Sequence, residues 1–262
     1  MTKSKSLEGK HALVTGGSRG IGYAIAQRLT DMGASVTLVG RGVESLEQAV
    51  AKLADSGQVA YASGDISQQA DVRRVFGQAK DRFGPVDILI NNAGQAVSER
   101  FDKLDEADWQ QMIAVNLTGT FHCMQAALTD MLERRWGRIV NVASTAGLIG
   151  YPYVSAYCAA KHGVIGLTRA LALETATKGV TVNAVCPGYT ETEIVHEAIA
   201  NITQKTGMSA EQAMAKLAGR NPQGRLIQPG EVADAVAWLC QPGAAGISGQ
   251  AIPVDGGEVM VG

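Results

Sequence analysis

Residues 11–22 read HALVTGGSRGIG, and this stretch decides the expected fold class. The apolar run at 11–16 is typical of a buried strand, and the segment from residue 20 favours a helix. Between the two, Gly16, Gly20 and Gly22 permit a tight turn and let a pyrophosphate approach the N-terminus of that helix. The stretch therefore predicts the first strand–turn–helix unit of an α/β fold that binds a dinucleotide. An ordinary turn between a strand and a helix is the alternative, which the rest of the chain has to decide.

Short apolar runs and helical segments alternate over the rest of the chain. The strand-like runs lie at 11–16, 35–40, 59–63, 86–92, 138–144, 180–187 and 251–256. The helix-like segments between them lie at 20–33, 43–56, 68–83, 105–134, 154–178 and 229–241. This alternation predicts one domain over residues 1–262, an α/β fold of the doubly wound Rossmann type with a seven-stranded parallel sheet and helices on both faces.

One segment, 189–228, interrupts this alternation and adds no strand. It reads as two helices separated at Thr206 and Gly207, with Ser209 as the N-cap of the second. Because the segment follows the stretch PGYTET at 187–192, we expect a small helical lid that closes over a bound ligand. A rigid extra pair of helices packed on the sheet is the alternative.

Composition and charge exclude several classes of function. The chain has 262 residues and a formal net charge of −2, from 23 Lys and Arg against 25 Asp and Glu. This balance provides no basic field for nucleic acid or an anionic membrane, and no apolar run is long enough to span a bilayer. The four cysteines form no C-x-x-C pair and no zinc-spaced cluster, so we expect no metal site and a reducing compartment. The start of the chain lacks the long apolar region of a secretory signal, and we expect a cytoplasmic protein.

The end of the second predicted strand bears on which dinucleotide is bound. An NAD-binding pattern places an acidic residue there to hold the ribose hydroxyls, but this chain reads LVGRG at 38–42. Arg41 can pair with the 2′-phosphate of NADP(H), and Arg19 in the glycine turn can assist, because the guanidinium fork matches phosphate geometry. The sequence therefore favours NADP(H), while NAD(H) stays open because both arginines could simply be solvated.

The stretch YVSAYCAAKHG at 153–163 carries a candidate acid/base pair. Its alanines favour a helix, and residues four apart share one helix face, so Tyr157 and Lys161 are expected to lie close together. A cation beside a phenol lowers the phenol pKa and makes proton transfer near neutral pH easier. A packed tyrosine and a solvated lysine are the alternative.

Together these motifs resemble the classical short-chain dehydrogenase/reductase family, from the first strand to the last residues. The stretches that carry the resemblance are TGGSRGIG (15–22), NNAG (91–94), VNLTG (115–119), NVAS (141–144), YCAAK (157–161), PGYTET (187–192) and VDGG (254–257). Their order along the chain is also that of the family. The resemblance implies an enzyme that transfers a hydride between a nicotinamide cofactor and a ketone or secondary alcohol.

The resemblance also implies a role for each catalytic residue. Tyr157 is the general acid/base, and Lys161 lowers its pKa and binds the nicotinamide ribose. Ser144 hydrogen-bonds the substrate oxygen, and Asn116 holds a water that connects Lys161 to solvent.

The expected cofactor and substrate contacts extend over several loops. Asp65 and Ile66 are expected at the adenine, residues 92–94 on the adenine-ribose side, and residues 187–192 at the carboxamide end of the nicotinamide. The full cofactor set comprises Gly16, Ser18, Arg19, Gly20, Ile21, Gly22, Arg41, Asp65, Ile66, Asn92, Ala93, Gly94, Tyr157, Lys161, Pro187, Gly188, Thr190 and Thr192. The expected substrate contacts are Ser144, Gln95, Tyr151, Tyr189 and Ile194.

The substrate class is suggested by the stretch NPQGRLIQPGEVADAVAWL at 221–239 together with VDGG. It is similar to the branch of 3-oxoacyl-thioester reductases, 3-hydroxyacyl-CoA dehydrogenases and polyketide ketoreductases, which favours a 3-oxoacyl (β-keto) thioester or 3-hydroxyacyl-CoA. Another small ketone, a hydroxy acid, or a cyclic or aromatic substrate stays open. A non-catalytic NADP-binding regulator is the alternative of another class, although the complete catalytic set argues against it. The resemblance further implies a homo-oligomer, a tetramer or dimer, formed through 105–134 and 154–178.

Overall fold

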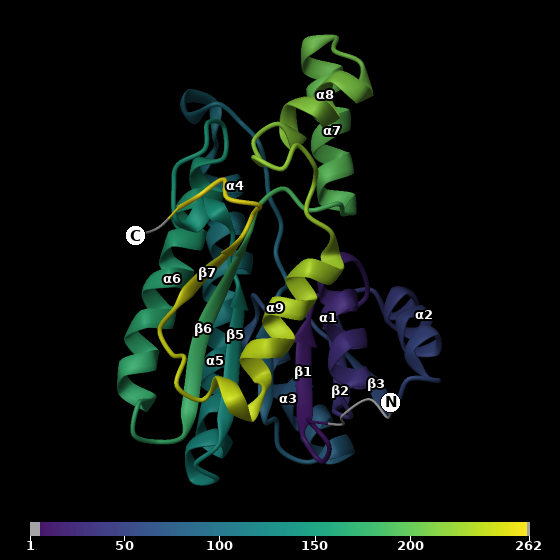
Figure 1. Ribbon diagram of the computed structural model, residues 1–262, viewed down its shortest axis with the longest axis vertical. Helices are drawn as coiled ribbons and strands as arrows, with labels where there is room; N and C mark the ends of the chain where they lie inside the picture. The colour runs from purple at the N-terminus through teal and green to yellow at the C-terminus, as the bar shows by residue number, and fades with distance from the viewer. Residues whose placement is uncertain (1–5, 261–262) are drawn as a thin grey trace.

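A seven-stranded parallel sheet forms the centre of the computed structural model, which describes residues 6–260 (Figure 1). Its strands are β1 (His11–Thr15), β2 (Ser35–Gly40), β3 (Val59–Ser63), β4 (Ile88–Asn91), β5 (Gly137–Val142), β6 (Val180–Pro187) and β7 (Ala251–Val254). They lie in the order β3-β2-β1-β4-β5-β6-β7, and neighbouring strands are parallel. The predicted doubly wound sheet is confirmed. The strand order reverses between β1 and β4, where such a sheet binds its ligand.

Helices cover both faces of this sheet. They are α1 (Gly20–Asp31), α2 (Val43–Leu53), α3 (Gln69–Phe83), α4 (Glu106–Ile113), α5 (Gly119–Glu133), α6 (Ser155–Thr175), α7 (Glu193–Thr206), α8 (Ala210–Ala218) and α9 (Pro229–Cys240). Ala12 and Val14 of β1 pack with α1, α2 and α9, whereas Leu13 packs with α3, α5 and α6 on the other face. Burial on both faces explains why the strands read as continuous apolar runs. Within residues 6–260, no helix is both long and apolar enough to cross a membrane.

The segment 105–134, expected as one helix, is interrupted. α4 ends at Ile113, one π-helical turn spans Ala114–Thr118, and α5 follows. In this turn the side-chain amide of Asn116 donates to the carbonyls of Met112 and Gln95, at 3.0 Å each. Apolar periodicity could not reveal this turn, which is accompanied by a contact with the loop after β4. Turns of this kind are frequent at functional sites.

The insert after β6 forms the two expected helices, which project beyond the upper end of the sheet (Figure 1). Gly207 ends α7 in the left-handed conformation (φ 73°), and Ser209 caps α8 in a capping box with Gln212, as the sequence predicted. The pair has its own small apolar cluster, separate from the clusters on the sheet, made of Val195, Ile199, Ala213, Leu217 and Leu226.

Candidate active site

The predicted catalytic residues lie at the carboxyl end of the central strands. Tyr157 and Lys161 occupy the first two turns of α6, and Lys161 Nζ lies 5.6 Å from the centroid of the Tyr157 ring. Lys161 is buried, and its Nζ donates to the carbonyl of Val142 at 2.9 Å. Ser144 lies two residues after Val142 in the chain, and its Oγ accepts a hydrogen bond from the backbone N–H of Ala146 at 3.1 Å. The end of β5 therefore holds both the lysine and the serine.

Asn116 joins this group through the loop after β4. A Cβ added to Gly94 would lie 2.8 Å from Asn116 Oδ1 and 3.7 Å from Lys161 Nζ. The backbone at Gly94 therefore lies close to both side chains. Asn116 Oδ1 also accepts from the backbone N–H of Gln95 at 3.2 Å. The Asn116 side chain thus fixes the loop backbone, and its role through a water stays a prediction. Gln95, expected at the substrate, is held here by its backbone.

Burial governs the acidity of the two titrating groups. It raises the pKa of Tyr157 to about 12, and the hydrogen bond with Ser144 opposes this shift only in part. Burial also lowers the pKa of Lys161 to about 8. The expected lowering of the Tyr157 pKa by Lys161 is therefore not found in the structure, because desolvation of the phenolate is the largest cause of the shift and raises the pKa. A phenol that keeps its proton at neutral pH is suited to give one to a substrate oxygen.

The glycine turn between β1 and α1 fits a phosphate group. Gly16 and Gly20 adopt positive φ angles of 64° and 53°, and a Cβ added to Gly22 would collide with the carbonyl oxygen of Gly16. α1 has no side-chain cap and no acidic residue in its first turn, which leaves its N-terminal N–H groups for an anion. Ser18 lies in this turn and Ile21 in the first turn of α1, where their contact with a cofactor stays a prediction, and the residues present fit a dinucleotide.

Thr15, which the sequence-based set omits, holds the glycine turn to the end of β4. Its buried Oγ1 accepts from the backbone N–H groups of Asn92 and Ala93, at 3.0 Å each. The side-chain amide of Asn92 donates back to the carbonyls of Thr15 and Gly16, at 3.0 and 3.1 Å. The signal for Thr15 was a polar residue at the end of an otherwise apolar strand. Asn92 and Ala93 thus organise the turn, and their contact with a cofactor stays a prediction.

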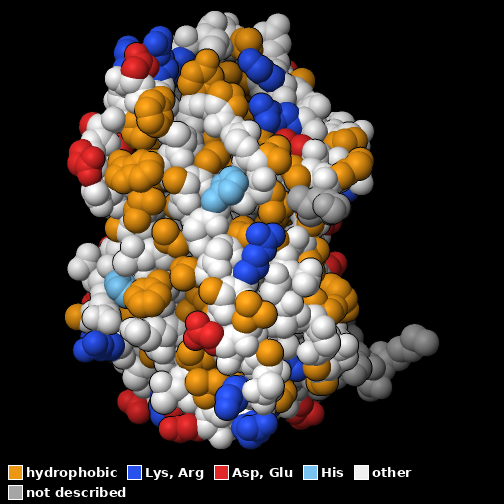
Figure 2. All heavy atoms as spheres, turned by 90° about the vertical axis from the view of Figure 1, so that its left-hand side faces the viewer, with side chains coloured by type: hydrophobic (Ala, Val, Ile, Leu, Met, Phe, Trp, Pro, Cys, Tyr) orange, Lys and Arg blue, Asp and Glu red, His pale blue; other side chains and the backbone are white. Residues whose placement is uncertain are grey.

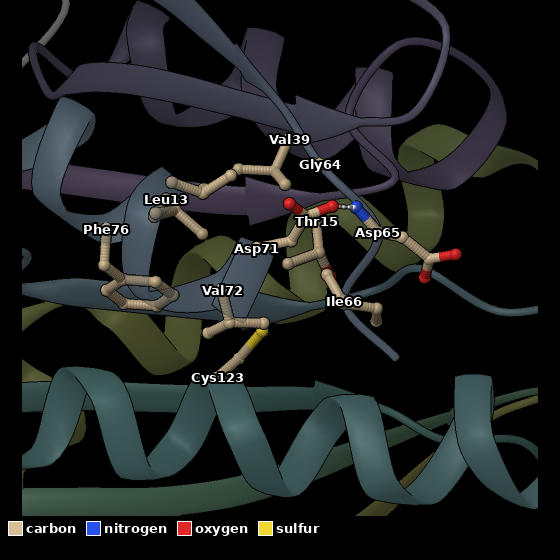
Figure 3. Close-up of a pocket in the computed structure, with 11 residues that line it drawn as sticks. Leu13, Thr15, Val39, Gly64, Asp65, Ile66, Asp71, Val72, Phe76 and Cys123 are labelled. Carbon is tan, nitrogen blue, oxygen red and sulfur yellow. Dashed lines mark hydrogen bonds between the residues drawn. The ribbon is translucent and has the colours of Figure 1, made fainter. Parts of the chain in front are cut away.

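Figure 3 shows a pocket beside the ends of β1, β2 and β3, which includes the two residues expected at the adenine. The Asp65 backbone N–H donates to Asp71 Oδ2 at 2.9 Å, and the Asp65 carboxylate points away from the apolar floor formed by Leu13 and Phe76. Asp71, which the sequence-based set also omits, is held by Arg74 at 2.7 Å. The loop that carries Asp65 and Ile66 is therefore ordered by α3.

Two arginines of the expected cofactor site have no acidic partner among the residues that the structure describes. Arg19 and Arg41 are both exposed, and neither forms an ion pair with another residue of 6–260. Arg41 follows β2 directly, and its carbonyl accepts from the Ser63 hydroxyl at 3.2 Å. Both guanidinium groups therefore remain available to an anion.

The loop 187–192 closes the other end of the expected cofactor site. The Gly188 N–H donates to the carbonyl of Val254, and a Cβ added to Gly20 would lie 3.3 Å from Thr192 Cγ2. The loop after Pro187 is thereby placed against the start of α1. Thr190 is buried and its hydroxyl donates to the Gly188 carbonyl at 3.0 Å, so Thr192 is the more accessible of the two threonines.

A family model described as short chain dehydrogenase matches residues 10–203. The chain belongs to the short-chain dehydrogenase family. This assignment agrees with the sheet order, the glycine turn and the grouping of Ser144, Tyr157 and Lys161.

Known members resemble this short-chain dehydrogenase over nearly their whole length. The D-beta-hydroxybutyrate dehydrogenase of Cupriavidus necator is 40% identical over 257 residues, which cover 97% of this chain and 99% of the relative. The 3-oxoacyl-acyl-carrier-protein reductase FabG of Vibrio cholerae is 41% identical over 98% of this chain and 100% of the relative. A crystal structure of a variant of actinorhodin polyketide ketoreductase with NADPH superposes with a TM-score of 0.93 at 39% identity, covering 97% of this chain and 98% of that one. This short-chain dehydrogenase is thus an oxidoreductase that uses a nicotinamide cofactor to interconvert a ketone and an alcohol.

The substrate side of this short-chain dehydrogenase contains two of the expected residues in contact. The rings of Tyr151 and Tyr189 meet edge to face, with centroids 6.3 Å apart. Tyr151 also contacts Glu258 and Arg220, which no sequence motif singled out. Ile194, on the first turn of α7, is 46% exposed and points to no buried cluster, so its substrate contact stays a prediction.

Proposed function

We propose that this enzyme reduces the ketone of a 3-oxoacyl thioester and prefers NADPH as the hydride donor. The observation that carries the proposal is the grouping of Ser144, Tyr157 and Lys161 opposite the open N-terminus of α1. Named relatives act on related compounds: one is a 3-oxoacyl-acyl-carrier-protein reductase and another is a ketoacyl reductase of Streptomyces coelicolor, 41% identical over 94% of this chain.

The residues of the site divide the chemistry between them. A bound nicotinamide supplies or accepts the hydride. As negative charge develops on the substrate oxygen, the Ser144 hydroxyl donates a hydrogen bond to it and Tyr157 gives up its proton. Lys161, anchored on the Val142 carbonyl, stabilises the phenolate that remains. In the reverse direction Tyr157 accepts the proton of an alcohol.

The preference for NADP(H) rests on the two free arginines. Arg41 follows β2, where an NAD-binding enzyme carries an acidic residue, and Arg19 lies in the glycine turn just before α1. Two unpaired guanidinium groups favour an additional phosphate on the adenosine ribose. The solved ketoreductase that this chain resembles was crystallised with NADPH, which supports the proposal.

The assembly that we propose is a homo-oligomer formed through α4, α5 and α6. Phe121 on α5 and Leu173 on α6 are 43% and 81% exposed, and such apolar side chains favour association. Figure 2 shows hydrophobic side chains distributed over the face on the left of Figure 1, where α6 lies. Light scattering of the protein and of Leu173→Glu tests this assembly, since the charge should weaken it. For location we propose the cytoplasm, because all four cysteines are unpaired.

A substrate screen tests the proposed function. Acetoacetyl-CoA, a simple cyclic ketone and an aromatic ketone are each mixed with NADPH or NADH, and oxidation of the cofactor is followed by absorbance. We expect the highest kcat/KM with acetoacetyl-CoA and NADPH. Turnover of the cyclic or aromatic ketones with little activity on the thioester would reject the proposed substrate class while leaving the oxidoreductase assignment intact.

A further inference from the structure

A polar group lies in the wall of the expected substrate site and has no role in the proton transfer described above. The Tyr151 hydroxyl lies 2.7 Å from Glu258 Oε1 and 2.9 Å from Thr145 Oγ1. The guanidinium of Arg220 lies over the Tyr151 ring, 4.7 Å from its centroid, and 3.7 Å from Glu258 Oε1. These residues come from the loop after β5, the segment after α8 and the segment after β7.

The direction of the hydrogen bonds in this group follows from the available protons. A tyrosine has one hydroxyl proton, and an ionised carboxylate can only accept. Tyr151 therefore donates to Glu258, and the Thr145 hydroxyl donates to the Tyr151 oxygen. Burial and the bond to Glu258 both raise the pKa of Tyr151, so this proton stays in place. Tyr151 has no further proton to offer a substrate.

The two charges of the group differ in their contact with solvent. The side chain of Glu258 is 8% exposed, whereas that of Arg220 is 40% exposed. Water screens the arginine more strongly, so the carboxylate dominates the potential on the inner side of the wall. The neighbouring carboxylate of Asp255 is bonded to the backbone N–H groups of Gly257 and Val259, which holds the segment that carries Glu258 in place.

This carboxylate is linked to the two loops that border the expected reacting centre. Thr145, which bonds Tyr151, directly follows Ser144, and Glu258 Oε2 lies 3.4 Å from where a Cβ at Gly188 would be. The segment after β7 passes beside the loop that leads from β6 to α7 (Figure 1), and the Gly188 N–H bonds the Val254 carbonyl. Tyr189, in that loop, contacts the Tyr151 ring edge to face.

We infer that Glu258 determines specificity by disfavouring substrates with a carboxylate near the ketone, so that the enzyme selects neutral 3-oxo esters, thioesters or amides over free 3-oxo acids. This inference rests on the proposed function and narrows its substrate class. A substrate carboxylate would meet a like charge in a poorly solvated wall where the Tyr151 hydroxyl proton already bonds Glu258. Repulsion of the wrong ligand is an ordinary source of specificity.

The test compares acetoacetate with acetoacetamide, which has nearly the same shape and no charge. The measured quantity is the ratio of kcat/KM for acetoacetate to kcat/KM for acetoacetamide, at saturating NADPH. We expect the wild type to prefer the amide, and Glu258→Gln to raise the ratio about tenfold by removing the like charge. Glu133→Gln is the matched control, because it removes an exposed carboxylate at the far end of α5 and should leave the ratio unchanged.

The outcomes separate this inference from the proposed function. A wild type that prefers acetoacetate, which would mean that Arg220 captures the carboxylate, overturns the inference, and so does an unchanged ratio in Glu258→Gln. If acetoacetyl-CoA is inert but the ratio responds, the proposed thioester substrate is wrong and the role of Glu258 holds. For a compound that is not reduced, its inhibition constant against the best ketone of the screen replaces kcat/KM. If Glu258→Gln does not fold, the ratio of the two kcat/KM values is measured in Glu258→Met and compared with the wild-type ratio.

Discussion

Lys161 and Tyr157 lie on one face of α6, with Lys161 Nζ 5.6 Å from the centroid of the Tyr157 ring, and both are desolvated. Burial moves their pKa values apart: the phenol holds its proton more tightly, and the ammonium holds its proton more loosely. In this state the pair is prepared to donate a proton, which matches the reduction that we propose.

Replacing Tyr157 by Phe removes the proton donor and keeps the ring. We expect reduction to slow by about 10²–10⁴-fold, while NADPH binding is retained because the glycine turn is untouched. Turnover is measured by cofactor absorbance, and binding by the fluorescence of NADPH. Tyr153→Phe, which alters an exposed tyrosine four residues upstream, is the control. Near-normal turnover in Tyr157→Phe would show that another group donates the proton.

Replacing Arg41 by Asp tests the cofactor preference. The variant loses a charge-assisted contact with the 2′-phosphate, and its new carboxylate repels that phosphate while suiting the ribose hydroxyls of NADH. We expect kcat/KM with NADPH to fall about tenfold to a hundredfold and the preference to reverse towards NADH. Arg73→Asp, on the exposed face of α3, gives the same change in charge as a control. A wild type that already prefers NADH contradicts the assignment of Arg41.

The insert 189–228 is expected to act as a lid. α7 and α8 pack on each other around an apolar cluster separate from those on the sheet, and Lys205 Nζ of α7 lies 3.8 Å from Glu99 Oε2 in the loop after β4. Few buried contacts with the sheet allow local opening. We expect fast amide exchange in α7 without ligands and protection when NADPH and a substrate bind, measured by hydrogen exchange with mass spectrometry. Equal protection in both states would support the rigid pair of helices.

The same lid predicts how substitutions on its inner end behave. Tyr189→Ala or Ile194→Ala should change the ranking of ketone substrates more than the affinity for NADPH, because Tyr189 contacts the Tyr151 ring and Ile194 lies on the first turn of α7. A set of kcat/KM values for several ketones, together with NADPH titrations, measures both effects. A loss of NADPH affinity alone would place these residues at the cofactor instead.

His11 makes the stability depend on pH. Its Nδ1 lies 2.8 Å from the Gly84 carbonyl and must carry the proton, so Nε2 accepts from Thr37, 2.9 Å away. Burial lowers the pKa of His11, so between the folded value and the unfolded value of about 6.5 the unfolded chain binds more protons. Stability is therefore complete above that pH and is lost as pH falls through the folded pKa. Urea unfolding between pH 5 and 8 should show this loss. His11→Gln should reduce the slope of the free energy of unfolding against pH. If that slope is the same in His11→Gln as in the wild type, groups other than His11 cause the pH dependence of the stability.

Local patterns along the chain were sufficient for most of the fold. The glycine turn, the break at Gly207 and the cap at Ser209 depend on backbone preferences of a few neighbouring residues, and each appears where the sequence placed it. The strand ranges follow from apolar runs, because a parallel sheet buries both faces of its strands. The pairing of Tyr157 with Lys161 follows from the helical repeat.

Tertiary structure decided what depends on distant contacts and on burial. The π-helical turn at Asn116 is accompanied by bonds to Gln95, and Tyr151 meets Glu258 across 107 positions of the chain, which no local pattern can encode. The raised pKa of Tyr157 likewise follows from desolvation by segments that converge only after folding. The sequence by itself thus pointed to the residues to which we assign the chemistry, whereas their protonation and the charge that we propose the substrate meets depend on how the chain packs around them.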